Sequence, residues 1–449
     1  MWSWVYFLSF CSLSLAQSNY EGHKIVRVIP ADDNHMRVLR DMGGQLGYEL
    51  DFIRNIHNVG RPGDLIVAPE NLDKTLNYLN DAQVPNEILV NNFERVVRRE
   101  RRALGQAPNE YEDDPTLIGK KYLPFDKQME ILGRIVARNP RKTRLEQIGV
   151  STEGRPIKAI WIGYPSNRTK TILWIDAGIH AREWIAPATA MYAIWHLVND
   201  KIYTTLLHHI DIVIVPNVNP DGYEYSRLHE RLWRKTRSKT GAVTCYGVDA
   251  NRNFPFHFGQ EGVSNQSCSE IYCGTNAESE PEVRAVVNAL RKYSSRIGGY
   301  LTLHSYGQDI LYPWGHTANR TEQYPPDVAD LVSMGNRMAA AIRSVNGTIY
   351  TVTNSGSGFY PASGASDDWA KSIGIKYSYT IELSPRTSYY GFELPNNFIE
   401  RVARETLKGM LELGKSFVKK TKSTTGEILR AKLNDGEINS KLRSQGRQG

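Results

Sequence analysis

The sequence predicts an α/β protein in which a mixed central sheet is flanked by helices and preceded by a small α+β open sandwich. Between residues 122 and 418, apolar runs rich in β-branched residues alternate with helical patterns, which is typical of a sheet covered on both faces. Between residues 18 and 97, shorter elements follow the order β-α-β-β-α-β. A length of 449 residues exceeds one average domain and agrees with one small and one large domain.

The N-terminus has the pattern of a secretory signal peptide. The first sixteen residues are apolar and end in Ser14-Leu15-Ala16, a small-x-small cleavage pattern. Because no Lys or Arg precedes the apolar run, an uncleaved signal anchor is the alternative. No other stretch reaches the roughly 18 to 20 apolar residues that a membrane span needs. We therefore expect a signal peptide over residues 1–16 and a secreted, extracellular protein without a membrane span.

The small domain is predicted from four short strands and two helices. The strand candidates are residues 24–29, 48–53, 64–67 and 86–90. The helix candidates are residues 34–45 and 71–80, and Asn71 is placed to cap the second helix. This order predicts an open sandwich with both helices on one face. It contains no cluster of catalytic residue types.

A charged stretch, residues 94–115, follows the small domain. It contains Arg98-Arg99 and Arg101-Arg102, and residues 99–102 have the form Arg-x-Arg-Arg, which subtilisin-like processing proteases accept and trypsin-like enzymes would also cut. Cleavage is easiest in an exposed, mobile linker. We therefore expect an activating protease to cut at Arg98–Arg102. A solvated charge run without this role is the alternative. Signal, small domain, basic linker and large domain, in that order, indicate a zymogen.

The large domain is predicted to place polar side chains at the ends of its core strands. The strand candidates are residues 158–162, 171–176, 210–215, 299–303 and 376–381, and the helix candidates are residues 186–199, 281–293, 328–345 and 398–417. Ligand sites in such sheets collect at the carboxyl ends of strands. His180, His304 and Glu382 all lie at or just past such ends.

The net charge of +7 is concentrated in local basic segments. From residue 419 to the end there are eight Lys or Arg against three acids. Neither this tail nor the 98–102 cluster has the interleaved aromatic residues of a nucleic-acid surface, so we expect no nucleic-acid partner. We expect the tail, residues 419–449, to be disordered.

His180 and Glu183 are candidate metal ligands. They stand three residues apart after a core strand, and zinc in hydrolases commonly takes two His and one carboxylate, with a fourth position open. The HxxE spacing alone also arises by chance from a surface His and a solvated Glu. His304, at the end of another core strand, completes a His₂Glu set. We therefore expect one Zn²⁺ per chain.

Several blocks of the sequence carry a resemblance to a known family. These blocks are HAREWI (180–185), NPDGY (219–223), WRKTRS (233–238), GVDANRN (247–253), LHSY (303–306), YPASG (360–364) and TIEL (380–383). In this order they resemble the zinc carboxypeptidases of the pancreatic A/B type, over about residues 20 to 418. The resemblance implies a carboxypeptidase-like catalytic domain over 103–418 and an activation propeptide domain, with its cleavage linker, over 17–102. It implies hydrolysis of the C-terminal peptide bond of a peptide or protein substrate.

The resemblance also assigns the residues that carry the chemistry. It makes His180, Glu183 and His304 the zinc ligands, the set known for carboxypeptidase A. Glu382 matches the catalytic carboxylate, which takes a proton as water attacks the scissile carbonyl and then delivers it to the leaving amine. Arg234 matches the cation that stabilises the oxyanion, a contribution on the order of 3 to 4 kcal/mol in the transition state.

Other matched residues are implied to bind substrate. Asn251 and Arg252 match the pair that grips the terminal carboxylate, which a guanidinium can hold bidentately. Tyr360 resembles the mobile tyrosine that caps the bound residue, and Arg182 resembles an arginine of an outer subsite. Taken singly, each could be a surface salt bridge or a core tyrosine. Two further residues of the matched blocks are expected to contact substrate, Ser305 and Tyr306.

Asp367 is expected to set the specificity. Its position matches the base of the pocket for the departing residue, where B-type members have an acid and A-type members an aliphatic side chain. A buried carboxylate is costly unless a Lys or Arg pairs with it, which favours removal of C-terminal Lys or Arg. Asp367 could instead be a helix N-terminal residue that backbone amides satisfy. A-like specificity, or a secreted binding protein without catalysis, are the alternative functions.

The cysteines and one loop complete the comparison with the family. Cys245 and Cys268 match the family's common disulfide, while the usual partner region of Cys273 has no cysteine. We therefore expect Cys273 to be free, with a Cys268–Cys273 bond as the alternative. Where much of the family reads Glu-Leu-Arg-Asp-Thr-Gly, this chain has Ser384-Pro385-Arg386 after Leu383. We expect a monomer.

Overall fold

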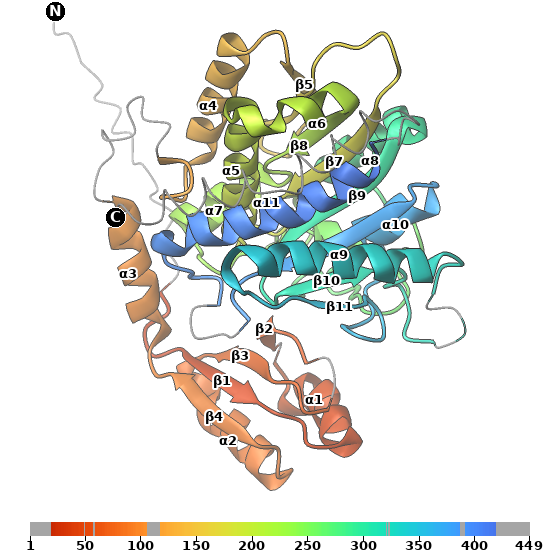
Figure 1. Ribbon diagram of the computed structural model, residues 1–449. Coiled ribbons are helices and arrows are strands. Elements are labelled where there is room, and N and C mark those ends of the chain that lie inside the picture. Colours follow the sequence, from red (N-terminus) through yellow and green to blue (C-terminus); the bar gives the residue numbers. More distant parts are fainter. Residues whose placement is uncertain are drawn as a thin grey trace, which may run out of the picture.

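The computed structural model describes residues 19–418 except 49, 57–58, 106–116, 320, 322–323 and 387–390. The chain forms a small N-terminal domain and a large domain built around a sheet, and α3 (Phe93–Gly105) extends from the small domain along the large one (Figure 1). The predicted signal peptide, residues 1–16, and the basic tail, residues 419–449, lie outside the described residues.

The small domain has the predicted order of elements. They are β1 (Lys24–Val28), α1 (Asp33–Leu46), β2 (Asp51–Arg54), β3 (Gly63–Val67), α2 (Leu72–Asp81) and β4 (Asn86–Val90). The four strands form an antiparallel sheet in the order β2-β3-β1-β4. Val26 and Val28 of β1 pack in one cluster with Met42 of α1 and Leu79 of α2, so both helices cover one face. Ile25 points to the opposite face because side chains alternate along a strand.

The helix caps of the small domain follow the sequence in part. Asp32 caps α1, its side chain accepting the amide of His35 at 2.8 Å, and Gly47 ends the helix in the left-handed region at φ 69°. The expectation for Asn71 was wrong. Pro69, Glu70 and Asn71 form a 3₁₀ turn, and the Asn71 side chain makes no capping bond to α2.

The first part of the charged stretch after the small domain is a helix and not a linker. Residues 93–105 form the amphipathic helix α3, which buries Phe93 and Val97 in a cluster with Leu232 and Phe392 of the large domain. The expectation of a mobile segment from residue 94 was wrong, because apolar residues four apart give this charged sequence one buried face. Residues 106–116 lie outside the described residues.

The large domain contains the predicted mixed sheet. Its strands are β5 (Thr143–Val150), β6 (Pro156–Ile162), β7 (Thr171–Ala177), β8 (Ile210–Val215), β9 (Ile297–Ser305), β10 (Asp309–Tyr312), β11 (Thr351–Asn354) and β12 (Tyr377–Leu383). The order across the sheet is β11-β10-β12-β9-β7-β8-β6-β5. The four central strands are parallel, whereas β10 and β6 run antiparallel to their inner neighbours.

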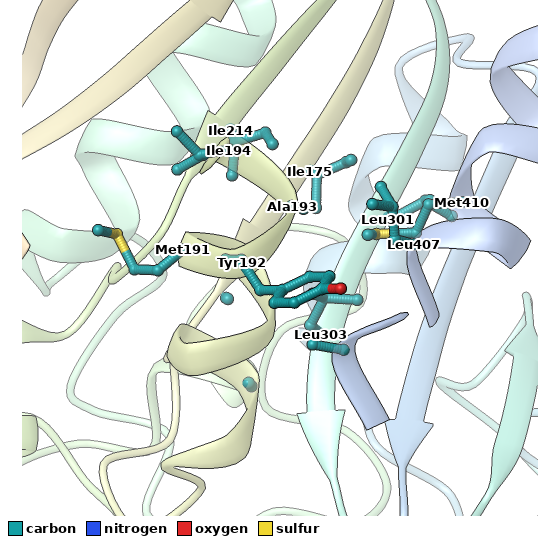
Figure 2. Packing of buried hydrophobic residues seen from close by; sticks show 14 of the residues in the cluster. Ile175, Met191, Tyr192, Ala193, Ile194, Ile214, Leu301, Leu303, Leu407 and Met410 are labelled. Atoms are coloured by element: carbon teal, nitrogen blue, oxygen red, sulfur yellow. The ribbon is translucent and has the colours of Figure 1, made fainter. Parts of the chain in front are cut away.

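Helices cover both faces of this sheet. They are α4 (Phe125–Arg138), α5 (Ile185–Asn199), α6 (Thr204–His209), α7 (Pro220–Leu228), α8 (Pro281–Tyr293), α9 (Val328–Asn346), α10 (Ser366–Ser372) and α11 (Ile399–Ser416). Short 3₁₀ segments also occur at Pro69–Asn71, Lys201–Tyr203, Ala250–Arg252, Ser294–Arg296 and Asn396–Phe398. In β7, Ile175 packs under α5 and α11 (Figure 2). Trp174 packs in the cluster on the other face with Val286 of α8. This burial on both faces explains the continuous apolar strands.

The parallel strands end at one edge of the sheet, and this edge positions the predicted residues. Asp176 of β7 lies in register with Thr302 of β9, and Glu382 of β12 lies in register with His304. In the part of the chain that the structure describes, no helix has the length and apolar character needed to cross a bilayer.

Candidate active site

His180, Glu183 and His304 meet at this edge. His180 and Glu183 lie in the turn between β7 and α5, and His304 is near the end of β9. His180 Nδ1 is 2.8 Å from Glu183 Oε1 and 3.1 Å from His304 Nδ1, and His304 Nδ1 is 3.2 Å from Glu183 Oε2. All three side chains are at most 4% exposed. The sequence prediction that these distant segments converge is therefore confirmed.

The arrangement fits a zinc ion. One donor atom from each residue lies within 4.8 Å of the other two, and two imidazoles with one carboxylate form a frequent ligand set of catalytic zinc. Two ring nitrogens and a carboxylate oxygen that face one another this closely can bind the same cation. Burial alone raises the pKa of Glu183, but the two imidazoles outweigh it and hold the pKa below its ordinary value.

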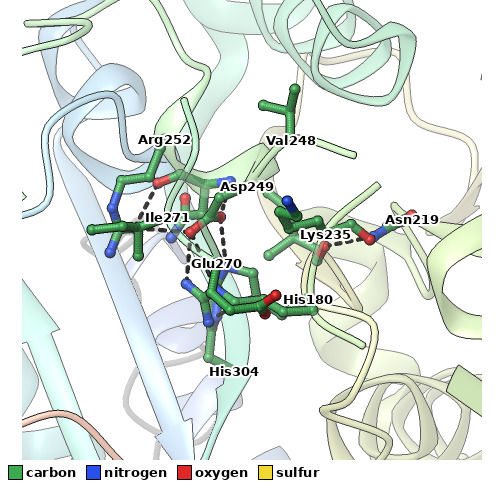
Figure 3. A network of polar contacts seen from close by, with 12 residues as sticks. His180, Asn219, Lys235, Val248, Asp249, Arg252, Glu270, Ile271 and His304 are labelled. Atoms are coloured by element: carbon green, nitrogen blue, oxygen red, sulfur yellow. Dashed lines mark hydrogen bonds and ion pairs between the residues drawn. The ribbon is translucent and has the colours of Figure 1, made fainter. Parts of the chain in front are cut away.

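Asp249 is a residue of this site to which sequence reasoning gave no role. Its Oδ1 lies 3.0 Å from His180 Nε2, and its Oδ2 accepts from Arg234 Nε at 3.1 Å and Nη2 at 2.9 Å (Figure 3). A carboxylate on the second ring nitrogen of a ligating histidine fixes its ring orientation and tautomer. Burial raises the pKa of Asp249, but Arg234 and His180 outweigh it, so the pKa lies well below its usual range. The sequence offered one indication of a role for Asp249, because it lies two residues before Asn251 in a block that matches the family.

Glu382 and Arg234 lie beside the three candidate ligands. Glu382 is buried on β12, and burial, with smaller contributions from Glu183 and Asp309, raises the pKa of its carboxyl to about 8. Arg234 Nη1 is 3.8 Å from Glu183 Oε1, and the guanidinium is anchored by Asp249. A buried carboxyl and a fixed cation therefore flank one metal-binding position.

Arg252 and Asn251 form the next layer of the site. The Arg252 guanidinium is fully buried and donates from Nε to Gly262 O and from Nη1 to Asn251 O, both at 2.9 Å. Its Nη2 is buried without a hydrogen-bond partner among the described residues. The Tyr360 ring centroid is 5.6 Å from the Arg252 guanidinium carbon. An unsatisfied buried guanidinium nitrogen is suited to an incoming anion.

Asp367 lies close to Asn251, because the preceding residue, Ser366, donates its amide to Asn251 Oδ1 at 2.9 Å. Asp367 is 3% exposed, and its Oδ2 accepts from Ser355 Oγ at 3.3 Å. Burial, and next the adjacent Asp368, raise the pKa of Asp367 to about 7. Hydrogen bonds from the Asp368 amide and the Thr380 side chain lower this pKa only in part. The carboxylate of Asp368 accepts the backbone amides of Gly315 and His316, both at 2.8 Å. The carboxylate of Asp367 is therefore held in a buried position at a substantial electrostatic cost.

The small domain contacts the residues around this site. Asp51 of β2 lies 3.3 Å from Arg182 Nη1, and the Leu232 amide donates to Tyr20 Oη at 3.3 Å. Tyr306 is buried in the same cluster as Phe93 of α3. Ser305, the last residue of β9, donates its amide to Glu183 Oε2 at 3.1 Å. Arg182 and Tyr306, two predicted substrate contacts, are thus covered by the N-terminal domain.

α3 adds a buried ion pair to this contact. The Glu100 carboxylate accepts from Arg231 Nη2 at 3.1 Å and also bonds Arg231 Nε. Arg231 is 2% exposed, donates to Phe392 O and Arg182 O, and stacks on Trp184 at 3.7 Å. Glu100 therefore anchors the helix that carries the predicted cleavage sites.

The cysteines are as expected. Cys245 and Cys268 form a disulfide, and Cys273 is a buried free thiol. The alternative Cys268–Cys273 bond is not formed.

Comparisons with known proteins agree with this site and with the small domain. Residues 129–409 match the family described as zinc carboxypeptidase. The chain belongs to the zinc carboxypeptidase family. Residues 26–100 match the carboxypeptidase activation peptide family, so the enzyme is made with an activation peptide, as a zymogen. The family resemblance, the fold class and the zinc cofactor expected from the sequence are therefore confirmed.

Relatives of both specificity types are similar to this zinc carboxypeptidase. The carboxypeptidase B of Astacus astacus is 42% identical over 305 residues, covering 67% of this chain and 98% of the relative. The carboxypeptidase A1 of Bos taurus is 33% identical over 404 residues, covering 89% of this chain and 95% of the relative. The crystal structure of thrombin activatable fibrinolysis inhibitor matches with a TM-score of 0.78 at 30% identity, covering 90% of this chain and all of that one.

Proposed function

We propose that the mature enzyme is a secreted carboxypeptidase that removes C-terminal Lys or Arg. The observation that carries this proposal is the buried carboxylate of Asp367, which has no cationic partner among the residues described around it. Similarity to the carboxypeptidase B of Astacus astacus supports it. Secretion rests on the apolar N-terminal pattern of residues 1–16.

We assign the zinc ligands as His180, Glu183 and His304. Zinc held there would lower the pKa of water towards ~7 and polarise the scissile carbonyl. His180 is kept in its ligating orientation by Asp249. Glu382 is the general base, because burial raises the pKa of its carboxyl and so makes it a stronger proton acceptor than an exposed glutamate. The proton that it takes from the attacking water goes to the leaving amine.

The oxyanion and the substrate's terminal carboxylate are bound by two different arginines. Arg234, held rigid by Asp249, lies beside the ligands and is oriented before reaction towards the charge that develops on the carbonyl oxygen. Arg252, with its unsatisfied Nη2, and Asn251 take the terminal carboxylate. Arg252 Nη1 lies 3.9 Å from Asp249 Oδ2, but the buried Nη2 has no hydrogen-bond partner among the described residues. A terminal carboxylate can satisfy this nitrogen and an internal peptide bond cannot supply the same charge, which explains selection for chain ends. Tyr360 lies over Arg252 and covers the bound residue.

Asp367 gives the preference for a basic residue. A pocket with a buried carboxylate disfavours an apolar side chain, which would leave the charge unpaired, and favours an ammonium or guanidinium that completes an ion pair. Ser355 already holds one carboxylate oxygen in place. Asp367 therefore acts on the choice of substrate and not on the hydrolytic step.

Latency is explained by the small domain. Asp51 is bonded to Arg182, and Tyr306 is buried in a cluster that includes Phe93 of α3, so both residues are covered against a peptide. Cleavage within Arg98–Arg102, by a subtilisin-like or trypsin-like protease, separates a propeptide over 17–102 from a catalytic domain over 103–418. We propose that the mature enzyme acts as a monomer on peptide and protein C-termini.

A substrate panel on the processed protein tests this function. Blocked dipeptides that end in Arg, Lys, Phe or Leu are compared by kcat/KM, for the wild type and for Asp367→Leu. We expect the wild type to prefer Arg and Lys, and the variant to lose that preference while it keeps activity on Phe. A wild-type preference for Phe would establish A-like specificity and contradict the role of Asp367. If a chelator left the activity on all four dipeptides unchanged, the metal-dependent mechanism would be contradicted.

A further inference from the structure

A cationic pocket of about 570 Å³ lies away from the metal site. It opens where β5, β7, β8 and β9 begin and where β6 ends. The metal site lies at the carboxyl ends of β7 and β9. Because β7 has seven residues, the two sites are separated by on the order of 20 Å along the strands. The pocket therefore belongs to neither the catalytic cleft nor the contact with the small domain.

Six cationic side chains line this pocket against one acid. The cations are Arg141, Lys142, Arg144, Arg168, Lys170 and Arg296. Asp211, the single acid of the lining, is already bound by Lys170 and Arg296, both at 2.6 Å. Lys170 also donates to three carbonyl oxygens, which fixes it in the wall. Neutralising the acid in this way leaves the pocket with a strong positive potential.

Two of the cations are available to a ligand. Arg141 and Arg168 are exposed, and neither has an ion pair with any residue in the described range. Arg144 lies over Trp161, its guanidinium carbon 3.9 Å from a ring centroid, and pairs with Glu146 at the margin. The pocket thus presents guanidinium groups, which bind sulfate and phosphate oxygens bidentately.

We propose that this pocket binds a sulfated polysaccharide. Its volume and the spread of its cations exceed what one sulfate ion would use, so the ligand carries several anionic groups. A single-stranded nucleic acid is disfavoured because it needs open aromatic faces for base stacking. Here Trp161 is 6% exposed under Arg144, and Tyr164 is already stacked on His208 with ring centroids 4.3 Å apart. A sulfated sugar needs charge and hydrogen bonds without stacking, which this lining offers.

The test compares two charge-reversal variants of the full chain. The pocket variant is Arg141→Glu with Arg168→Glu. The matched control is Lys239→Glu with Arg343→Glu, which makes the same charge change at exposed positions outside the lining. All proteins carry Asn167→Gln, because a glycan on the Asn167 sequon would stand in the pocket. The basic tail is common to all of them, so its contribution cancels.

Binding of a heparin-derived oligosaccharide is titrated at several salt concentrations. We expect the slope of log K against log salt to become shallower by about two for the pocket variant, with at least about tenfold weaker binding at low salt. The control should stay within about twofold of the parent protein that carries Asn167→Gln alone. After processing, all three should hydrolyse a blocked dipeptide with the same kcat/KM, which shows that they fold.

Three outcomes would overturn the proposal. Equal heparin binding by the pocket variant and the control would place the affinity elsewhere, for example in the tail. Full displacement of heparin by millimolar inorganic sulfate at constant ionic strength would reduce the pocket to a single-ion site. A single-stranded DNA of the same charge is the third probe. If it bound as tightly as the heparin oligosaccharide, and if the pocket variant lost that binding, a preference for sulfated sugars would be contradicted.

Discussion

At the scale of single residues, most charged side chains of the site are buried and have a partner of opposite charge. The exceptions are the groups that we expect to bind the substrate or to transfer a proton. Asp249 contacts His180, Arg234 and, at 3.9 Å, Arg252, and so it links the metal position to the two cations beside it. Arg252 Nη2 and the carboxyl of Glu382 are buried without a comparable partner. Buried polar groups without a partner lower the stability of the fold. They therefore indicate the positions where a substrate binds or a proton is transferred.

The role of Glu382 is tested by Glu382→Gln. The amide keeps the shape of the side chain but cannot accept a proton, so we expect zinc to remain bound while kcat falls by about 10² to 10⁴-fold. Metal content by atomic absorption and turnover of the processed protein are measured together. Near-normal turnover with zinc in place would contradict the assignment of the base.

The raised pKa of Asp367 predicts that selectivity depends on pH. Because burial raises this pKa from its ordinary value to about 7, the carboxyl is neutral below that pH and charged above it. The preference for a basic residue should therefore be present above about pH 7 and be lost as pH falls through it. The ratio of kcat/KM for dipeptides ending in Arg and in Phe is the measurement, since titration of Glu382 affects both substrates alike and cancels.

We expect that ratio to rise by up to about tenfold per pH unit below pH 7 and then to level off. In Asp367→Asn it should be low and independent of pH. A wild-type ratio that stays constant between pH 5.5 and 8 would contradict the placement of an ionising carboxylate in the pocket.

At the scale of elements, α3 shows what a sequence pattern leaves undecided. Its composition, with five arginines over residues 95–102, indicated a solvated linker. Phe93 and Val97 become a buried face only because Leu232 and Phe392 of the large domain are present to cover them. Glu100 is buried for the same reason, through Arg231. The local sequence therefore showed that this segment is highly charged but did not predict the tertiary contact that orders it.

Glu100→Gln tests whether this ion pair holds the zymogen closed. Glu100→Gln removes the hydrogen-bonded counter-charge of the buried Arg231 and leaves Glu393 as its remaining acidic neighbour. Breaking a buried ion pair costs about 3 to 5 kcal/mol in other proteins. We expect the uncleaved zymogen to show at least about tenfold more activity, and processing after Arg102 to be faster because α3 unwinds more easily. Activity is assayed with protease inhibitors present and chain length is checked on a gel.

Glu87→Gln is the matched control, since it makes the same charge change on an exposed side chain of β4. It should leave latency unchanged. If Glu100→Gln were as silent as this control, Glu100 would have no part in restraining the propeptide.

At the scale of the whole molecule, the sequence predicted the architecture through its most regular segments. β7, β8, β9 and β12 are buried on both faces, so their apolar runs could be read directly and their polar ends could be placed at one edge. The elements of the large domain that escaped prediction are α4, α6, α7, α10, β5, β10 and β11. Of these, α6, α7, α10, β10 and β11 are short and depend on neighbours for their burial, whereas α4 and β5 are long but only partly buried, so their apolar pattern is weaker. Asp249 escaped for a related reason, since its partners His180 and Arg234 lie 69 and 15 residues away in the sequence.

The central claim is that two imidazoles and one carboxylate, brought together by the ends of β7 and β9, hold the zinc of this enzyme. Anomalous diffraction from crystals, recorded on both sides of the zinc absorption edge, tests it most directly. We expect one zinc peak at about 2.0 to 2.2 Å from His180 Nδ1, His304 Nδ1 and a Glu183 oxygen. A zinc-loaded crystal with no peak among these three atoms, or with its only peak elsewhere, would contradict the account.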